Sequence, residues 1–93
     1  MIRSFKCKET EKIFKRNISK KFPQNIQRIA LRKLRMLNRS TNLNELKVPP
    51  GNRLESFKGD RKNQFSIRIN DQWLICFEWK NNDSYNVEIT DYH

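Results

Sequence analysis

Several residue types are scarce in this 93-residue chain, and each scarcity narrows the class of protein. There are two cysteines, far apart and without a CxxC pair, and one histidine, so a metal site is not expected. We expect Cys7 and Cys76 to be reduced, partly buried thiols, and we expect no cofactor. No apolar run approaches the roughly 20 residues of a membrane span, and the first residues lack a signal-peptide core, which predicts a cytoplasmic protein.

Acidic residues are also scarce, since 20 Lys and Arg stand against 10 Asp and Glu. The imbalance lies in residues 1–47, which hold fourteen basic and three acidic residues, whereas residues 48–93 hold six and seven. Such a positive electrostatic field favours binding to nucleic-acid phosphates, anionic membranes or an acidic partner protein. The charge alone does not show which of these is the partner. The length predicts one domain, residues 1–93.

Apolar periodicity predicts an α+β domain with two layers, in which two N-terminal helices pack on an antiparallel sheet of about four strands. The helix at 9–18 is expected to place Phe14 and Ile18 on one face, and Pro23 suits the first turn of the next helix. A hairpin turn is expected at 70–72. The expected elements are a short strand at 2–5, helices at 9–18 and 23–39, and strands at 65–69, 73–79 and 85–90.

The second helix has two distinct faces. At about 100° per residue, one side gathers apolar residues and the opposite side gathers four arginines. A charged face can be merely solvated, but four guanidiniums without interleaved carboxylates repel one another, which favours a phosphate or an acidic ligand. The apolar residues are Ile26, Ile29, Ala30, Leu34 and Leu37, and the arginines are Arg28, Arg32, Arg35 and Arg39.

Five short motifs stand in a fixed order along the chain. They are Pro49-Pro50-Gly51-Asn52-Arg53-Leu54, Lys58-Gly59-Asp60-Arg61, Ser66-Ile67-Arg68, Asn70-Asp71-Gln72-Trp73 and Asp91-Tyr92-His93. This set resembles the HigB-type toxins of the RelE superfamily. The resemblance implies a ribosome-dependent endoribonuclease that cuts mRNA in the decoding site. On that reading, we expect the four arginines of the second helix, Arg28, Arg32, Arg35 and Arg39, to bind RNA. It also implies a helix-turn-helix antitoxin of the HigA type as partner, with the toxin monomeric and oligomeric only through that antitoxin.

The residues present can be matched to RNA cleavage by the ribose 2′-OH, which needs proton transfer and stabilisation of a phosphorane. His93 alone has an unperturbed pKa near neutrality and is the candidate for proton transfer, with Asp91 orienting it. Lys58, at the family's Lys-Gly-Asp-Arg position, and Arg68 would stabilise charge. Tyr92 would stack on a base.

Structural alternatives stand beside these assignments. His93 can be a frayed tail, Asp91 can protect an edge strand, and Tyr92 can cover the core. Arg68 can be an ordinary exposed arginine. Arg61 can contact RNA or pair with a neighbouring carboxylate in its turn.

Two positions depart from the family pattern. Leu74 follows Trp73 where the family typically has arginine, and we expect Leu74 on the same face as Arg68. Losing such a donor costs roughly 3 kcal/mol of transition-state stabilisation, so an attenuated toxin that still binds its antitoxin and the ribosome is one alternative. Glu55 lies where some relatives have histidine, and it is either a general base or a surface carboxylate. A gyrase-inhibiting relative of the ParE type is another alternative.

Overall fold

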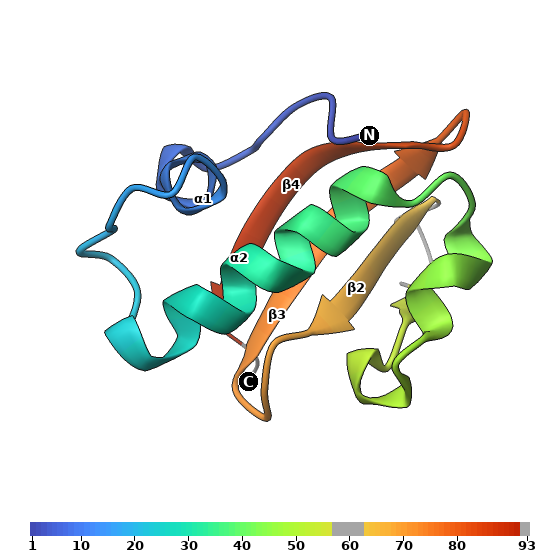
Figure 1. Cartoon of the computed structure of the whole chain (residues 1–93). Helices are drawn as coiled ribbons and strands as arrows, with labels where there is room; N and C mark the ends of the chain where they lie inside the picture. Colours follow the sequence, from blue (N-terminus) through green and yellow to red (C-terminus); the bar gives the residue numbers. More distant parts are fainter. Residues whose placement is uncertain (57–62, 92–93) are drawn as a thin grey trace.

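The computed structural model describes residues 1–56 and 63–91, which form a helical layer on an antiparallel sheet (Figure 1). The helices are α1 (Lys8–Phe14) and α2 (Gln24–Arg39), followed by the 3₁₀ helices η1 (Leu43–Lys47) and η2 (Pro50–Asn52). The strands are β1 (Glu55–Ser56), β2 (Gln64–Arg68), β3 (Trp73–Lys80) and β4 (Asp83–Asp91), in the order β1-β2-β3-β4. All neighbours are antiparallel, so the predicted α+β fold is confirmed. None of the helices in the described ranges is long and apolar enough to cross a membrane.

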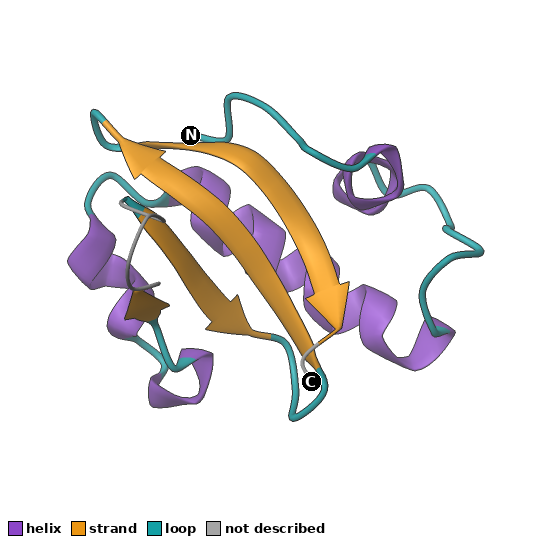
Figure 2. Cartoon of the chain, turned by 180° about the vertical axis from the view of Figure 1, so that it is seen from behind, coloured by secondary structure: helices purple, strands orange, loops and turns teal. Residues whose placement is uncertain are grey.

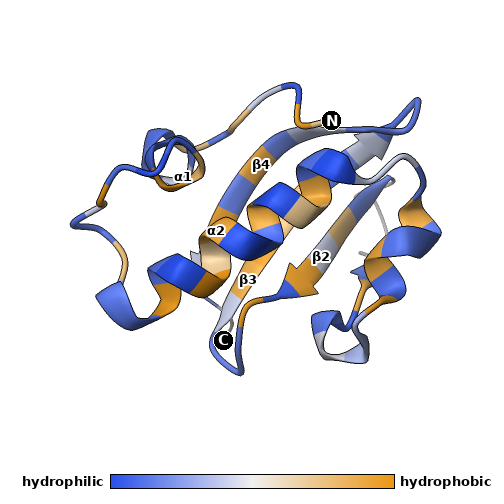
Figure 3. Ribbon diagram, viewed as in Figure 1, coloured by the Kyte–Doolittle hydropathy of each residue, from blue (hydrophilic) through white to orange (hydrophobic). Residues whose placement is uncertain are grey.

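Helix α2 packs its apolar side across the sheet and forms the centre of the core (Figure 3). The predicted stripe is confirmed, except that Ile29 is only half-buried. Burial of each large aliphatic side chain contributes about 1.5–3 kcal/mol, so this contact is what fixes the helix on the sheet. The buried residues are Ile26, Ala30, Leu34 and Leu37 from α2, and Ile67, Ile75, Phe77, Val87 and Ile89 from the sheet.

Helix α1 ends earlier than predicted, at Phe14 and not at Ile18. Arg16 adopts a left-handed backbone (φ 67°), and the next two amides turn back onto the helix: Arg16 N donates to Ile13 O at 2.9 Å and Asn17 N donates to Lys12 O at 2.8 Å. This pair of bonds is a Schellman ending, which glycine usually marks in a sequence. Because an arginine takes that position here, the sequence does not signal the end of the helix. The prediction for Ile18 is wrong, since this residue is 72% exposed and does not share a helix face with Phe14.

The segment at 2–5 was predicted as a strand but makes only two isolated parallel bridges to β4, Ile2 with Ser84 and Phe5 with Val87. A buried hydrogen bond adds to this side of the fold, because Thr10 Oγ1 of α1 accepts from the amide of Ile89 at 3.0 Å. Helix α1 is thereby fixed against the outer edge of β4.

The loop between α2 and β1 is held by one buried side chain, Asn52, which is fully covered by protein. Its Nδ2 donates to the carbonyl oxygens of Leu46 at 3.1 Å and Val48 at 3.4 Å. Its Oδ1 accepts from the ammonium of Lys33 on α2. The Asn52 amide therefore connects both 3₁₀ helices to α2 and brings the chain to β1.

Candidate functional site

The sheet has a second face, which we call the open face, on the side away from α2 (Figure 2). Side chains alternate along a strand, so the residues between the core residues point to this side. The pairing register places them in two neighbouring rows. One row holds Arg68, Leu74 and Thr90, and the other holds Glu55, Ser66, Cys76 and Glu88.

Leu74 lies on the same face as Arg68, as predicted. The two residues are also directly opposite each other, because β2 and β3 pair through them. Leu74 is only 7% exposed, yet it lies outside the core cluster that packs under α2. Arg68 is half-buried, and its Nη1 donates to the carbonyl of Asp71 in the hairpin turn at 3.5 Å. The predicted turn is confirmed, since Asn70 Oδ1 accepts from the amides of Gln72 and Trp73, both at 2.8 Å. A guanidinium and an aliphatic side chain thus stand side by side at this end of the open face.

Asp91 lies at the same end of the sheet, but its side chain leaves the strand on the helical face, opposite to the open face. It pairs with Trp73, whose ring packs edge-to-face on Phe22 on the helical side, with centroids 5.6 Å apart. The carboxylate is exposed, and its Oδ2 accepts from Gln72 Nε2 at 3.4 Å. The described residues therefore bring Arg68 and Leu74 together and leave Asp91 at the rim beside them.

Four of the predicted site residues, Lys58, Arg61, Tyr92 and His93, lie outside the described residues. Glu55 is exposed at the start of β1, where its pairing with Ser66 puts it on the open face, two residues along the sheet from the Arg68 row. This separation corresponds to about 7 Å. Glu55 thus shares a face with Arg68.

The four arginines of α2 form a second candidate surface, which we call the arginine ridge: Arg28, Arg32, Arg35 and Arg39. Together with Leu31 they line a hollow of about 540 Å³. In the described part of the chain, none of these guanidiniums forms an ion pair. Because the opposite side of α2 is buried against the sheet, the ridge and the open face point to opposite sides of the molecule.

The charge of the ridge affects its neighbour Lys33. Partial burial is the main cause that lowers the pKa of Lys33, and the nearby charge of Arg32 lowers it further. Lys33 turns inward to donate to Asn52 Oδ1. Burial and the Arg32 charge therefore both disfavour the charged form of Lys33.

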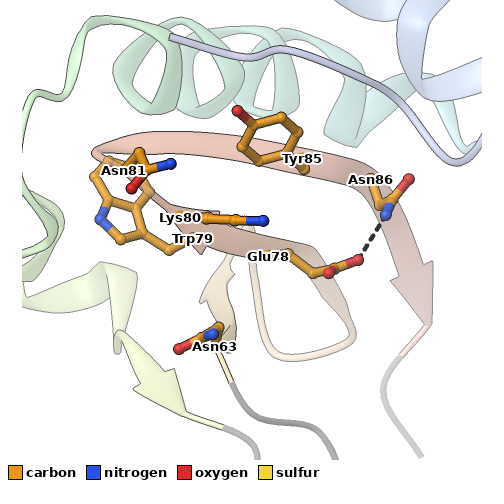
Figure 4. A pocket seen from close by; sticks show the side chains of 7 residues that line it. All are labelled: Asn63, Glu78, Trp79, Lys80, Asn81, Tyr85 and Asn86. Atoms are coloured by element: carbon orange, nitrogen blue, oxygen red, sulfur yellow. Dashed lines mark hydrogen bonds between the residues drawn. The ribbon is translucent and has the colours of Figure 1, made fainter.

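A hollow at the tip of the β3–β4 hairpin, which we call the hairpin pocket, was not anticipated from the sequence (Figure 4). Its volume is about 460 Å³. The available signal was the Asn81–Asn82 turn between Trp79 and Tyr85, since paired asparagines suit a tight hairpin with positive φ. The lining residues are Asn63, Glu78, Trp79, Lys80, Asn81, Tyr85 and Asn86.

Both cysteines are free and half-buried, as predicted. The thiol of Cys7 sits just before α1. Although burial alone would raise its pKa, hydrogen bonds from the backbone of Thr10 and Glu9 outweigh burial and lower it. Across residues 1–56 and 63–91, no three His, Cys, Asp or Glu side chains are close enough to hold a metal ion.

The fold and these surfaces define a small basic α+β domain with one sheet face turned away from its helices and a separate arginine-rich helix face. The family model described as the RelE-like toxin of the type II toxin-antitoxin system HigB matches residues 3–93. The chain belongs to this family, and the resemblance stated from its motifs is confirmed. A type II system implies a protein antitoxin as partner.

Three curated proteins illustrate the similarity. Over the full length of both chains, the sequence is 34% identical to "Endoribonuclease HigB" of Proteus vulgaris. It is 35% identical to "Toxin HigB-1" of Vibrio cholerae over 70% of this chain and 68% of that protein. It is 37% identical to an uncharacterized protein of Haemophilus influenzae over 72% of this chain, and that match spans 66% of the relative.

Proposed function

We propose that this chain is the toxin of a type II toxin-antitoxin system and a ribosome-dependent endoribonuclease that cuts mRNA in the decoding site. The observation that carries the proposal is the match to the HigB-like toxin family along residues 3–93, joined to a full-length relative named as an endoribonuclease. The sheet face away from α2, on which Arg68 lies, supports it. A ribosomal target would place the protein in the cytoplasm.

The proposed reaction is attack of a ribose 2′-OH on the adjacent phosphorus. The O–P bond to the 5′-oxygen breaks, which leaves a 2′,3′-cyclic phosphate and a 5′-hydroxyl. One proton leaves the 2′-OH and one reaches the departing oxygen. We assign proton transfer to His93, with Asp91 orienting it from the rim of the sheet, and we keep Glu55 as a second candidate base on the open face. No metal ion takes part in this scheme.

Charge stabilisation is assigned to Arg68 and Lys58, because the phosphorane gains negative charge that a guanidinium or ammonium can stabilise. Tyr92 would stack on a base of the substrate. The position of Arg68 supports its assignment, since its half-buried guanidinium lies on the open face and contacts the Asp71 carbonyl of the hairpin turn at 3.5 Å.

We assign the arginine ridge to ribosomal RNA, with Arg61 as a further phosphate contact. The ridge and the open face point in opposite directions, so one RNA strand is not expected to contact both. This arrangement supports an mRNA on the open face and ribosomal RNA on α2. Binding through the ridge should depend steeply on salt, because each neutralised phosphate releases counterions.

A second candidate function, an attenuated toxin that binds without cutting efficiently, is favoured by Leu74. An aliphatic side chain, 7% exposed, lies directly across from Arg68 where the family typically has arginine. Such a protein would retain its antitoxin, which we propose is a helix-turn-helix HigA-type chain, and its ribosome contacts. We propose that the toxin itself is monomeric.

The deciding experiment is cleavage of a defined mRNA by the purified chain, with and without programmed ribosomes. Cuts that require ribosomes are expected. Antitoxin binding without cuts would support the attenuated toxin. No cleavage together with inhibition of DNA gyrase would overturn the proposal in favour of a ParE-type gyrase inhibitor. A charge-reversal variant, Arg32→Glu, should weaken ribosome binding, whereas Lys20→Glu, an exposed lysine outside the ridge, serves as the matched control.

A further inference from the structure

The hairpin pocket continues the open face beyond the candidate catalytic end. Glu78 pairs with Tyr85, and Glu78 alternates along β3 with Leu74 and Cys76, so both pocket residues point to the open side of the sheet. Four residues of strand separate Glu78 from Leu74, which corresponds to about 13 Å. An RNA strand that crosses the open face from the Arg68 row would reach this pocket a few nucleotides away from the scissile phosphate.

The walls of the pocket are fixed before any ligand arrives. Asn86 Nδ2 donates to Glu78 Oε2 at 2.6 Å, and the amide of Asn86 donates to Ser4 Oγ at 2.8 Å. Asn86 has a positive φ of 52°, at the irregularity where the β3–β4 register shifts. On the other side, Trp79 N donates to the carbonyl of Asn63 at 2.8 Å. Figure 4 shows the Glu78–Asn86 bond at one end and Trp79 with Asn81 at the other.

Two polar groups of the pocket form no hydrogen bond or ion pair with the described residues. Within residues 1–56 and 63–91, neither the Lys80 ammonium nor the Tyr85 hydroxyl takes part in a hydrogen bond or an ion pair. The Tyr85 side chain is half-buried, and Lys80 lines the same pocket (Figure 4). Among the described residues, only one carboxylate oxygen of Glu78 takes part in a hydrogen bond, the Oε2 that accepts from Asn86.

This combination matches one class of ligand. A partly exposed aromatic ring in a pocket offers a surface for a planar base, and stacking on such rings is how proteins usually hold unpaired RNA bases. An ammonium lining the same pocket suits the phosphate that is attached to the base. The free carboxylate oxygen and nearby amides suit the pairing edge of a base that presents N–H groups. A volume of about 460 Å³ lies within the range of small-molecule sites.

We propose that the hairpin pocket binds one nucleotide of the mRNA that flanks the cleavage site. Tyr85 stacks on its base, Lys80 contacts its phosphate, and Glu78 accepts from its N–H edge, which favours guanine because guanine offers two adjacent donors. This inference rests on the proposed function, since it names a further subsite for the same RNA. It adds base preference to a site whose other assigned groups transfer protons, stabilise the phosphorane or, as proposed for Tyr92, stack on a base of any kind.

The test is direct binding to the purified chain without ribosomes, using GMP, AMP, CMP, UMP and guanosine as probes and tryptophan fluorescence as the signal. Trp79 lines the pocket, so Trp79→Phe should remove the change in fluorescence. GMP should bind saturably and more tightly than UMP. Tyr85→Leu, which keeps an apolar side chain, should weaken binding about tenfold, whereas Tyr85→Phe should retain it. Lys80→Ala should weaken GMP but not guanosine, and Lys20→Ala on the helical side should change neither.

The outcomes separate this inference from the proposed function. Saturable binding that Tyr85→Leu weakens, with no cuts on ribosomes, would support the pocket and overturn the nuclease. The chain could instead cut mRNA on ribosomes while none of the four mononucleotides binds saturably and Tyr85→Leu leaves the base preference at the cut sites unchanged. That result would refute the pocket and leave the nuclease standing. Equal weakening by Lys80→Ala and Lys20→Ala would also overturn the pocket, because it would reveal attraction by net charge alone.

Discussion

Replacing Leu74 by arginine should have two opposite effects, a loss of stability and a gain of cleavage. Leu74 is 7% exposed, and covering a leucine contributes about 1.5–3 kcal/mol. The aliphatic stem of arginine recovers part of that contact. The new charge, however, would lie directly opposite Arg68, and like charges at such a pair cost up to about 1 kcal/mol. We expect a net loss of about 2 kcal/mol.

This loss has a measurable size in a chain of this length. A domain of 60–100 residues loses roughly 4–8 °C of melting temperature per kcal/mol, so Leu74→Arg should melt about 10 °C lower. Leu74→Met is the matched control, since it keeps volume and apolarity and should cost less than about 1.5 kcal/mol. If the missing guanidinium limits the rate, cleavage on programmed ribosomes should rise about a hundredfold in Leu74→Arg and stay unchanged in Leu74→Met.

Two results would refute this reasoning. If Leu74→Arg melts at the temperature of the unaltered chain, then Leu74 is not packed as its low exposure indicates. If the arginine variant is folded at the assay temperature and cuts no faster than Leu74→Met, then no guanidinium is missing at this position and Arg68 or Lys58 already stabilises the phosphorane.

Three further predictions concern other parts of the chain. A hydrogen bond from Arg3 holds the pKa of Asp83 below its usual value. The Asp83 carboxylate therefore stabilises the fold fully above about pH 4, and this contribution is lost as the pH falls through the lowered pKa. In urea unfolding, Asp83→Asn should make the free energy of unfolding fall less steeply at acid pH. Asn52→Ala should cost about 2–3 kcal/mol in the same assay by leaving the Leu46 carbonyl without its donor, and an unchanged midpoint would contradict the buried bond. His93→Ala should abolish toxicity but retain antitoxin binding, and continued killing of cells would remove His93 from the mechanism.

The periodic elements could be predicted because each depends on short-range patterning. The apolar stripe and the arginine ridge of α2 follow from its period of 3.6 residues, and both are found on opposite sides of the helix. The strands alternate with a period of two, which fixed the β2–β3 hairpin and set Leu74 against Arg68. Where a residue acted against its usual preference, as Arg16 did in closing α1, prediction from the sequence failed.

By itself the sequence determined the fold class, the family and the faces of the main elements, because these follow from periodicity and from short motifs in order. Only the tertiary structure decided how the surfaces relate. The tertiary structure places the arginine ridge and the open face on opposite sides and puts Asp91 on the same face as Trp73. It also forms the pocket that Glu78 and Tyr85 line. These relations depend on strand register and on a shift of that register beside Asn86, and neither is encoded in the spacing of any single segment.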